Sequence, residues 1–174
     1  MKTLIPAEAI RQRVAELAAQ IEAYYQGRPV VIVGVLTGCL VFLADLIRQI
    51  NLPLRIHLIQ ASSYRGEATI PSELILCLDS LPDLQGREVL LVDDILDTGQ
   101  TLSRIVAELR RREAASVRVS VLLRKIGRQS VPLEPDYVGF EIPDEFVVGY
   151  GLDYNDEYRQ LPFIGVLGSE RGQV

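Results

Sequence analysis

The sequence predicts an α/β fold in which a mainly parallel central sheet is flanked by helices. Short apolar runs alternate with longer segments whose apolar residues recur at helical spacing, a pattern typical of parallel sheets. Two runs, at 30–36 and 89–92, are continuously apolar, as expected of strands covered on both faces. Because the chain has 174 residues and is 48% hydrophobic, we expect one core and a single domain spanning 1–174.

In the first half of the chain, two helices and three strands are expected. Residues 6–26 carry apolar side chains at helical spacing after a proline and before Gly27, which predicts a helix with a defined start and stop. Helical periodicity resumes from Gly38 onward. The strands are expected at 30–36, 54–61 and 74–78, and the polar stretch 62–72 has the length of a lid loop.

The second half of the chain alternates in the same way and then changes character. The run at 89–92 predicts a buried strand, residues 101–113 an amphipathic helix, and residues 117–123 another strand. In the last third, proline and glycine separate short apolar runs. Only short strands are therefore expected there, at 137–142, 146–148 and 163–167.

The charge balance argues against several classes of partner. A formal net charge of −5 disfavours a nucleic-acid or membrane-surface partner, since both need a cationic field. No apolar run reaches membrane-spanning length and no secretory signal pattern is seen, so we expect a cytoplasmic protein. Cys39 and Cys77 are isolated thiols and are expected in the core. The lone His57 is expected to be structural.

The most informative segment joins the strand at 89–92 to the helix that follows. The apolar run ends in Asp93, Asp94 and Asp97, and residues 98–101 form a turn containing glycine and two threonines. Open α/β sheets bind ligands at the carboxyl ends of their strands, and a helix N-terminus favours an anion. These residues predict a site for a sugar phosphate. The alternative interpretation is that Asp97 and Thr98 only cap the helix.

Five blocks of sequence carry a resemblance to a known family. The segment 89–101 resembles the phosphoribosyl pyrophosphate signature of the type I phosphoribosyltransferases. Four more blocks, at 33–38, 62–64, 122–125 and 137–154, are similar to the hypoxanthine-guanine phosphoribosyltransferases. The resemblance implies a type I phosphoribosyltransferase fold with a small hood and a flexible lid loop. It also implies Mg²⁺-dependent transfer of the 5-phosphoribosyl group from phosphoribosyl pyrophosphate to hypoxanthine or guanine, giving IMP or GMP plus pyrophosphate in purine salvage.

The resemblance implies roles for individual residues on the phosphoribosyl side. Asp97 is the candidate catalytic base, at the purine N7. Asp93 and Asp94 are expected to hold the ribose hydroxyls and, with Asp153, to bind the metal. The 5′-phosphate is expected to be wrapped by Thr98, Gly99, Gln100 and Thr101.

On the purine and pyrophosphate sides, the resemblance implies a second set of roles. Lys125 is placed on the purine 6-oxo oxygen, where an ammonium distinguishes an acceptor from a 6-amino donor. Phe146 stacks on the base, Val147 reads its edge through the backbone, and Asp153 adjoins it. Pyrophosphate contacts are implied for Thr37, Gly38 and Arg159, and the lid is expected to open at Ser63 and Tyr64.

Two departures from the family pattern and one open question about the backbone bear on substrate binding. Thr37 stands where relatives usually carry Lys or Arg, so one cation facing pyrophosphate is absent. In the lid, Ala68-Thr69 replaces a usual Ser-Thr pair, and Arg65 is a hypothetical substitute cation. Many relatives hold the peptide bond before the Thr37 position cis, and the sequence leaves the Leu36-Thr37 bond open.

Two other functions were weighed against this interpretation. A nucleotide-sensing regulator that binds RNA or DNA would need a basic face, whereas the only basic cluster, at 110–112, is explained by a helix C-terminus. An enzyme of the same fold that uses xanthine, adenine or a pyrimidine is closer, and Lys125 with Phe146 and Val147 favours a 6-oxopurine. Family members commonly assemble, so a homo-dimer or homo-tetramer is expected.

Overall fold

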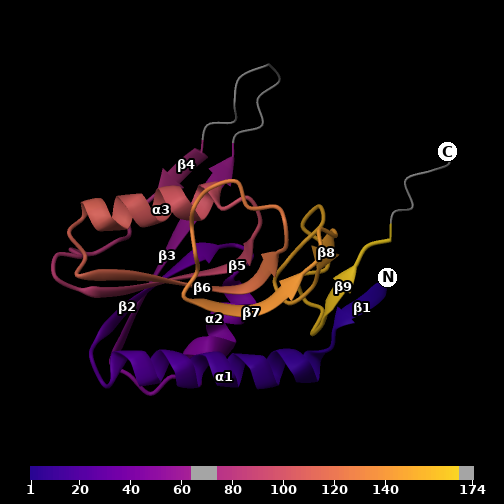
Figure 1. Cartoon of the computed structure of the whole chain (residues 1–174), viewed down its shortest axis with the longest axis horizontal. Coiled ribbons are helices and arrows are strands. Elements are labelled where there is room, and N and C mark those ends of the chain that lie inside the picture. The colour runs from indigo at the N-terminus through magenta and orange to yellow at the C-terminus, as the bar shows by residue number, and fades with distance from the viewer. Residues whose placement is uncertain (64–73, 169–174) are drawn as a thin grey trace.

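The computed structural model describes residues 1–63 and 74–168, and its framework is a six-stranded sheet (Figure 1). The strand order is β4-β3-β2-β5-β6-β7. All neighbouring strands are parallel except β4, which is antiparallel to β3. The strands are β2 (Val30–Leu36), β3 (Leu54–Ser63), β4 (Leu74–Cys77), β5 (Glu88–Leu96), β6 (Ser116–Lys125) and β7 (Tyr137–Ile142). The predicted parallel sheet is confirmed.

Helices cover both faces of this sheet. Figure 1 shows α1 (Ala7–Tyr25) and α2 (Leu40–Ile47) on one face and α3 (Gln100–Arg111) on the other. Successive residues of β5 enter the two resulting cores in turn: Leu90 and Val92 pack on the α1 side, and Val89 and Leu91 on the α3 side. Burial on both faces explains why this run is continuously apolar.

A second, three-stranded antiparallel sheet forms a hood beyond the carboxyl ends of β6 and β7 (Figure 1). It consists of β1 (Lys2–Ile5), β9 (Ile164–Val166) and β8 (Val147–Val148), in that order. The strand β1 was not predicted, because four residues are too short to show a period and its partner β9 lies at the other end of the chain. Residues 149–163, which connect β8 to β9, are called the hood loop, and they lie with the hood beyond the ends of β6 and β7 (Figure 1).

The structure confirms the expected burial of one thiol and corrects it for the other. Cys39 is buried, but Cys77 is exposed, so the prediction that both lie in the core was wrong for Cys77. The physical reason is that β4 is the edge strand and has one neighbour instead of two. The His57 ring lies 3.1 Å from the Ser80 carbonyl oxygen, and its structural role stays a prediction. Within the described residues, no helix is long and apolar enough to cross a membrane.

Candidate active site

The two adjacent carboxylates lie in the last residues of the central strand β5. Asp93 is 8% exposed, and its carboxylate accepts a hydrogen bond from the Asp94 backbone N–H at 2.9 Å. Asp94 in turn accepts one from the Ile95 N–H at 2.9 Å. Burial, together with the neighbouring Asp94 carboxylate, raises the pKa of Asp93 well above its ordinary value. Burial also raises the pKa of Asp94. Hydrogen bonds to its carboxylate and the charge of Arg159 act in the opposite direction and offset part of this rise.

The turn after β5 leads into α3 without a side-chain cap. Its cap residue is Gly99, whose φ of +83° suits glycine, and the helix begins at Gln100. Asp97 and Thr98 are therefore not the cap residue. Thr98 Oγ1 does accept a hydrogen bond from the Gln100 N–H, the first of the helix, at 3.4 Å, so the alternative interpretation holds in part for Thr98 and not for Asp97. The turn is held from outside, because the Ser130 N–H donates to the Thr98 carbonyl at 2.9 Å.

A cavity of about 240 Å³ lies at this end of the sheet. Its apolar lining comes from β2, β3, β5 and α3. The rest consists of six predicted phosphoribose residues and of Gly38, in the turn after β2: Asp93, Asp94, Asp97, Thr98, Gly99, Thr101 and Gly38. The structure thus brings together acids and backbone amides at one helix N-terminus. Such a cavity can hold a phosphorylated, hydroxyl-bearing ligand.

The predicted pyrophosphate turn connects β2 to α2. The Leu36-Thr37 peptide bond is cis, and the Leu40 N–H donates to the Thr37 carbonyl at 3.1 Å. Gly38 packs directly against Asp94: a Cβ placed on Gly38 would lie 1.8 Å from Asp94 Oδ2. The turn after β2 and the end of β5 that carries Asp94 therefore fit together only because residue 38 has no side chain.

The hood contributes the arginine predicted to contact pyrophosphate. Arg159 Nη2 lies 2.9 Å from Asp153 Oδ1, and Arg159 Nη1 donates to the Gly151 carbonyl at 2.7 Å. Gly151 also sits on the pyrophosphate turn, since a Cβ placed on it would lie 2.2 Å from the Gly38 carbonyl oxygen. Arg159 is thus fixed to the same loop that covers Gly38.

A cluster of four charges marks the predicted purine side. The Lys125 Nζ lies 3.6 Å from Asp97 Oδ2 and 3.5 Å from Asp144 Oδ1. Arg128 Nε donates to Asp97 Oδ1 at 2.9 Å and lies 3.6 Å from Asp144 Oδ1. The Lys125 side chain is only 12% exposed, whereas that of Asp97 is 39% exposed. Each carboxylate therefore meets both cations, and Asp97 remains reachable from solvent.

Phe146 is exposed in a position suited to stacking. It is 53% exposed and packs edge-to-face against Tyr154, with ring centroids 5.5 Å apart. The next residue, Val147, is buried and begins β8, the edge strand of the hood sheet. An edge strand carries backbone donors and acceptors on its outer side. Phe146 and Val147 thus offer a ring and a polar backbone edge side by side.

Comparisons with known proteins agree with this geometry. Residues 2–155 match the family model described as the phosphoribosyl transferase domain. A hypoxanthine phosphoribosyltransferase of Haemophilus influenzae is 44% identical over 165 residues, which make up 93% of this chain and 92% of that protein. The chain belongs to the hypoxanthine-guanine phosphoribosyltransferase family. The structure of a hypoxanthine-guanine phosphoribosyltransferase of Bacillus anthracis, solved with a HEPES molecule in the active site, superimposes on this chain with a TM-score of 0.90 and 40% sequence identity. The superposition covers 97% of this chain and 99% of that one.

Some relatives of this phosphoribosyltransferase are longer. The bifunctional protein TilS/HprT of Listeria innocua is 42% identical over 170 residues, which make up 97% of this chain and 26% of that protein. The chain therefore corresponds to about a quarter of that relative and to nearly all of the Haemophilus influenzae one.

Other predicted site residues do not line the cavity that contains Asp93 and Asp94. Among the residues that the structure describes, these are Thr37, Gln100, Lys125, Phe146, Val147, Asp153 and Arg159. Ser63 is the last residue of β3, while the predictions for Tyr64, Arg65 and Ala68-Thr69 fall outside the described residues. Sequence reasoning missed Arg128, Asp144 and Gly151. The only available signals were the short distance of Arg128 from Lys125 along the chain and the Gly-Tyr-Gly triplet containing Gly151.

The acids do not form a ready-made metal cage. Within residues 1–63 and 74–168, no group of three or more His, Cys, Asp or Glu side chains could hold a metal ion. Mg²⁺, however, prefers hard oxygen ligands and is commonly bound by one or two carboxylates plus substrate phosphates. The adjacent carboxylates of Asp93, which is buried, and Asp94, which is half-buried, fit such a shared site, because a cation would offset the cost of removing them from water.

Proposed function

We propose that this phosphoribosyltransferase transfers the 5-phosphoribosyl group from phosphoribosyl pyrophosphate to hypoxanthine, guanine or both, forming IMP or GMP and releasing pyrophosphate. The observation that carries the proposal is the single cavity in which β5 places Asp93 and Asp94 beside the amide-rich turn before α3. Asp97 also lines this cavity, and its Oδ2 lies 3.6 Å from Lys125 Nζ. The family membership supports the same reaction.

The phosphoribosyl half of the site binds and orients the sugar. Backbone N–H groups of residues 98–101 hold the 5′-phosphate, helped by the N-terminal dipole of α3. The carboxylates of Asp93 and Asp94 accept hydrogen bonds from the ribose hydroxyls. These bonds replace hydrogen bonds to water that the two carboxylates lost when the protein folded. This leaves carbon 1 of the sugar facing the purine side, with pyrophosphate toward Gly38 and Arg159.

The purine half of the site recognises the base and handles its proton. Lys125 donates to the 6-oxo oxygen, and Asp97 accepts a hydrogen bond from N7–H. As the bond from carbon 1 to the pyrophosphate oxygen breaks and N9 bonds to carbon 1, Asp97 takes the N7 proton and pyrophosphate leaves. Without ligand, Asp97 accepts instead from Arg128, so the incoming N7–H takes over one carboxylate oxygen. Phe146 stacks on the ring, and the backbone of Val147 contacts its edge.

Magnesium fits this arrangement as an ion shared with the substrate. Asp93 and Asp94 on the ribose side and Asp153 on the pyrophosphate side would hold it, directly or through water. When bound, Mg²⁺ neutralises the charge of the pyrophosphate group and makes it a better leaving group. Because the acids do not form a closed cage, we expect weak metal binding without substrate and tight binding with it.

The reaction is tested by measuring pyrophosphate release from phosphoribosyl pyrophosphate with Mg²⁺ and one base at a time. Hypoxanthine, guanine or both should support turnover, and adenine should not, because its 6-amino group would face the Lys125 donor. Xanthine measures how strictly the 2-position is read. Turnover with adenine alone would reject the assigned specificity, and no turnover with any base would reject the reaction.

The role of Asp97 is tested separately with Asp97→Asn. The amide keeps the shape and the interaction with the sugar but cannot take a proton. We expect the dissociation constant for phosphoribosyl pyrophosphate to stay within about threefold and kcat to fall on the order of 10²-fold or more. An unchanged kcat would remove Asp97 from the base role.

We also propose that the chain acts as one unit over residues 1–174 in the cytoplasm and assembles as a homo-dimer or homo-tetramer. Both cysteines are free, which suits a reducing compartment. Leu40 on α2 and Ile56 and Leu58 on β3 are 50%, 42% and 39% exposed, which is unusual for large aliphatic side chains on neighbouring elements. Sedimentation velocity tests this assembly: Ile56→Lys should lower the mass of the particle, and a monomeric wild-type protein would refute it.

A further inference from the structure

Tyr150 adopts a backbone conformation that needs support from its surroundings. Its φ is +51°, and its neighbours Gly149 and Gly151 have φ values of +99° and +102°. Three successive positive φ angles are unusual, and the central residue is a bulky aromatic. The Tyr150 N–H donates to the Leu161 carbonyl at 2.8 Å, and its side chain is buried. The strained turn is therefore held at both its backbone and its ring.

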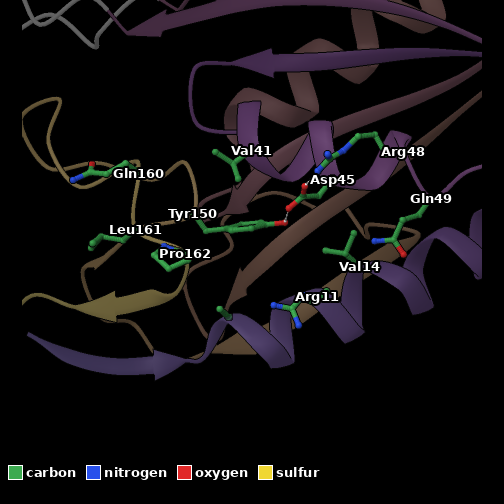
Figure 2. A pocket seen from close by; sticks show the side chains of 11 residues that line it. Arg11, Val14, Val41, Asp45, Arg48, Gln49, Tyr150, Gln160, Leu161 and Pro162 are labelled. Carbon is green, nitrogen blue, oxygen red and sulfur yellow. Dashed lines mark hydrogen bonds and ion pairs between the residues drawn. The ribbon is translucent and has the colours of Figure 1, made fainter.

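The Tyr150 hydroxyl links the hood loop to α2. It donates to Asp45 Oδ2 at 2.6 Å, and Figure 2 shows the ring reaching from the hood toward the helix, with Asp45 also paired to Arg48. The bond runs along the wall of a cavity of about 510 Å³ between α1, α2 and the hood, on which Val41 and Leu161 also lie. A tyrosine bonded to an ionised partner makes one of the stronger side-chain hydrogen bonds.

Both partners of this bond adjoin the predicted pyrophosphate contacts. Asp45 lies one to two turns after the start of α2, the helix that follows Gly38. Gly151 comes directly after Tyr150, rests on the Gly38 carbonyl oxygen and accepts from Arg159. Gly38 in turn packs against Asp94. A continuous set of contacts thus joins the Tyr150–Asp45 bond to the acid, the turn and the arginine.

We infer that Tyr150 and Asp45 are positioning residues that fix the pyrophosphate side of the site by holding the hood loop onto the turn at Gly38. Neither residue lines the cavity that contains Asp93 and Asp94. This inference rests on the proposed function and adds that the bond affects the pyrophosphate side of the site and not the purine side. Loss of the bond should loosen Gly151, Arg159 and Gly38 together, whereas the purine-side pair of Lys125 and Asp97 lies on other elements, at the ends of β6 and β5.

The test compares Tyr150→Phe and Asp45→Ala with the wild-type enzyme. We expect each variant to raise KM for phosphoribosyl pyrophosphate about tenfold, the size expected for a hydrogen bond to a charged group, while KM for hypoxanthine stays within twofold. Calorimetric affinity for magnesium pyrophosphate should fall by a similar factor. The double variant should lose no more than either single one, because both remove the same bond.

Two further variants separate positioning from general loosening. Tyr25→Phe removes the hydroxyl of a fully buried tyrosine that has no hydrogen-bond partner among residues 1–63 and 74–168, and it should change neither constant. Asp45→Asn keeps an oxygen acceptor and should restore most of the affinity lost in Asp45→Ala. Wild-type behaviour of Tyr150→Phe would overturn the inference, as would an equal rise of both KM values. If the wild-type enzyme itself shows no turnover, the proposed function fails, and the pyrophosphate affinities alone decide the role of this bond.

Discussion

Gly38→Ala should abolish most activity while leaving the protein folded. The added methyl would lie 1.8 Å from Asp94 Oδ2 and 2.5 Å from its Cγ. Real Cβ atoms essentially never approach closer than 3.0 Å, so carboxylate and turn must separate by at least about 1.2 Å, taken as the difference of these two distances. A misplacement of about 1 Å in an active site costs roughly 10²-fold in rate. We therefore expect kcat/KM for phosphoribosyl pyrophosphate to fall on the order of 10²-fold.

The direction of the movement explains why activity suffers more than stability. The atom that the methyl would meet is the end of the Asp94 side chain, so the carboxylate can turn away from residue 38 while α2 keeps its buried side chains in the core under α1. Because Asp94 is predicted to hold a ribose hydroxyl and Gly38 to contact pyrophosphate, their separation spoils two substrate contacts at once. The loss should appear in both kcat and KM.

Gly34→Ala provides the matched control for this substitution. Its Cβ would meet only side chains, with Leu43 Cδ2 at 2.6 Å, Leu58 Cδ2 at 3.2 Å and Cys39 Sγ at 3.3 Å. We expect it to cost about 1–3 kcal/mol of stability through overpacking while keeping kcat/KM within about fivefold at a temperature where both variants are folded. Steady-state kinetics and thermal unfolding measure both quantities. Gly38→Ala with activity within threefold of wild type would refute the reasoning.

Three more predictions follow from the charges of the site. In the metal-free protein, the raised pKa of Asp93 means that its contribution to stability is full below the ordinary aspartate pKa and is lost as pH rises through the raised value. Asp93→Asn should therefore increase the melting temperature at pH 8 in EDTA, by roughly 2–4 °C per kcal/mol, and not at pH 4, while abolishing activity; equal shifts at both pH values would contradict this. Lys125→Met should lower kcat/KM for hypoxanthine about 10- to 150-fold, as for a charged hydrogen bond, whereas Arg128→Met, which removes an exposed ion pair, should change it less than about fivefold. Equal losses would show that Lys125 is not the specific donor. Thr37→Lys should lower KM for phosphoribosyl pyrophosphate about two- to fivefold at low salt, with a smaller gain at 0.5 M salt; an increase would mean that the turn excludes a cation.

Elements with strong local patterns could be predicted from the sequence. The helix α1 buries Ile10, Val14, Leu17 and Ile21 as its periodicity indicates, and β5 was recognised because its residues face two cores. The acids were assigned to the end of that strand, and β5 does continue through Asp93 and Asp94. Local periodicity and the position of a ligand at the carboxyl end of a strand are both encoded in neighbouring residues, which is why they can be read without coordinates.

Features that depend on contacts between distant segments could not be predicted. The pairing of β1 with β9 joins residues 2–5 to residues 164–166, and no local pattern in either segment indicates the other. The approach of Arg128 to Asp97 depends on how the loop after β6 turns at Gly127, whose φ is +77°. Likewise, the glycines at 38 and 151 were visible as residues, but their packing on each other follows only from the placement of the hood.

We expect the neutral Thr37 to make the hood more important for pyrophosphate in this chain. The family resemblance implies a cation at this position of the turn, and Thr37 supplies none. Here the charge of Arg159 lowers the pKa of Asp94, and the Arg159 side chain is held by Asp153 and by the Gly151 carbonyl. Any movement of the Tyr150 loop therefore shifts the cation as well as the backbone that rests on Gly38. It follows that Thr37→Lys should reduce the effect of Tyr150→Phe on pyrophosphate affinity, because the turn would then hold a charge that does not depend on the hood.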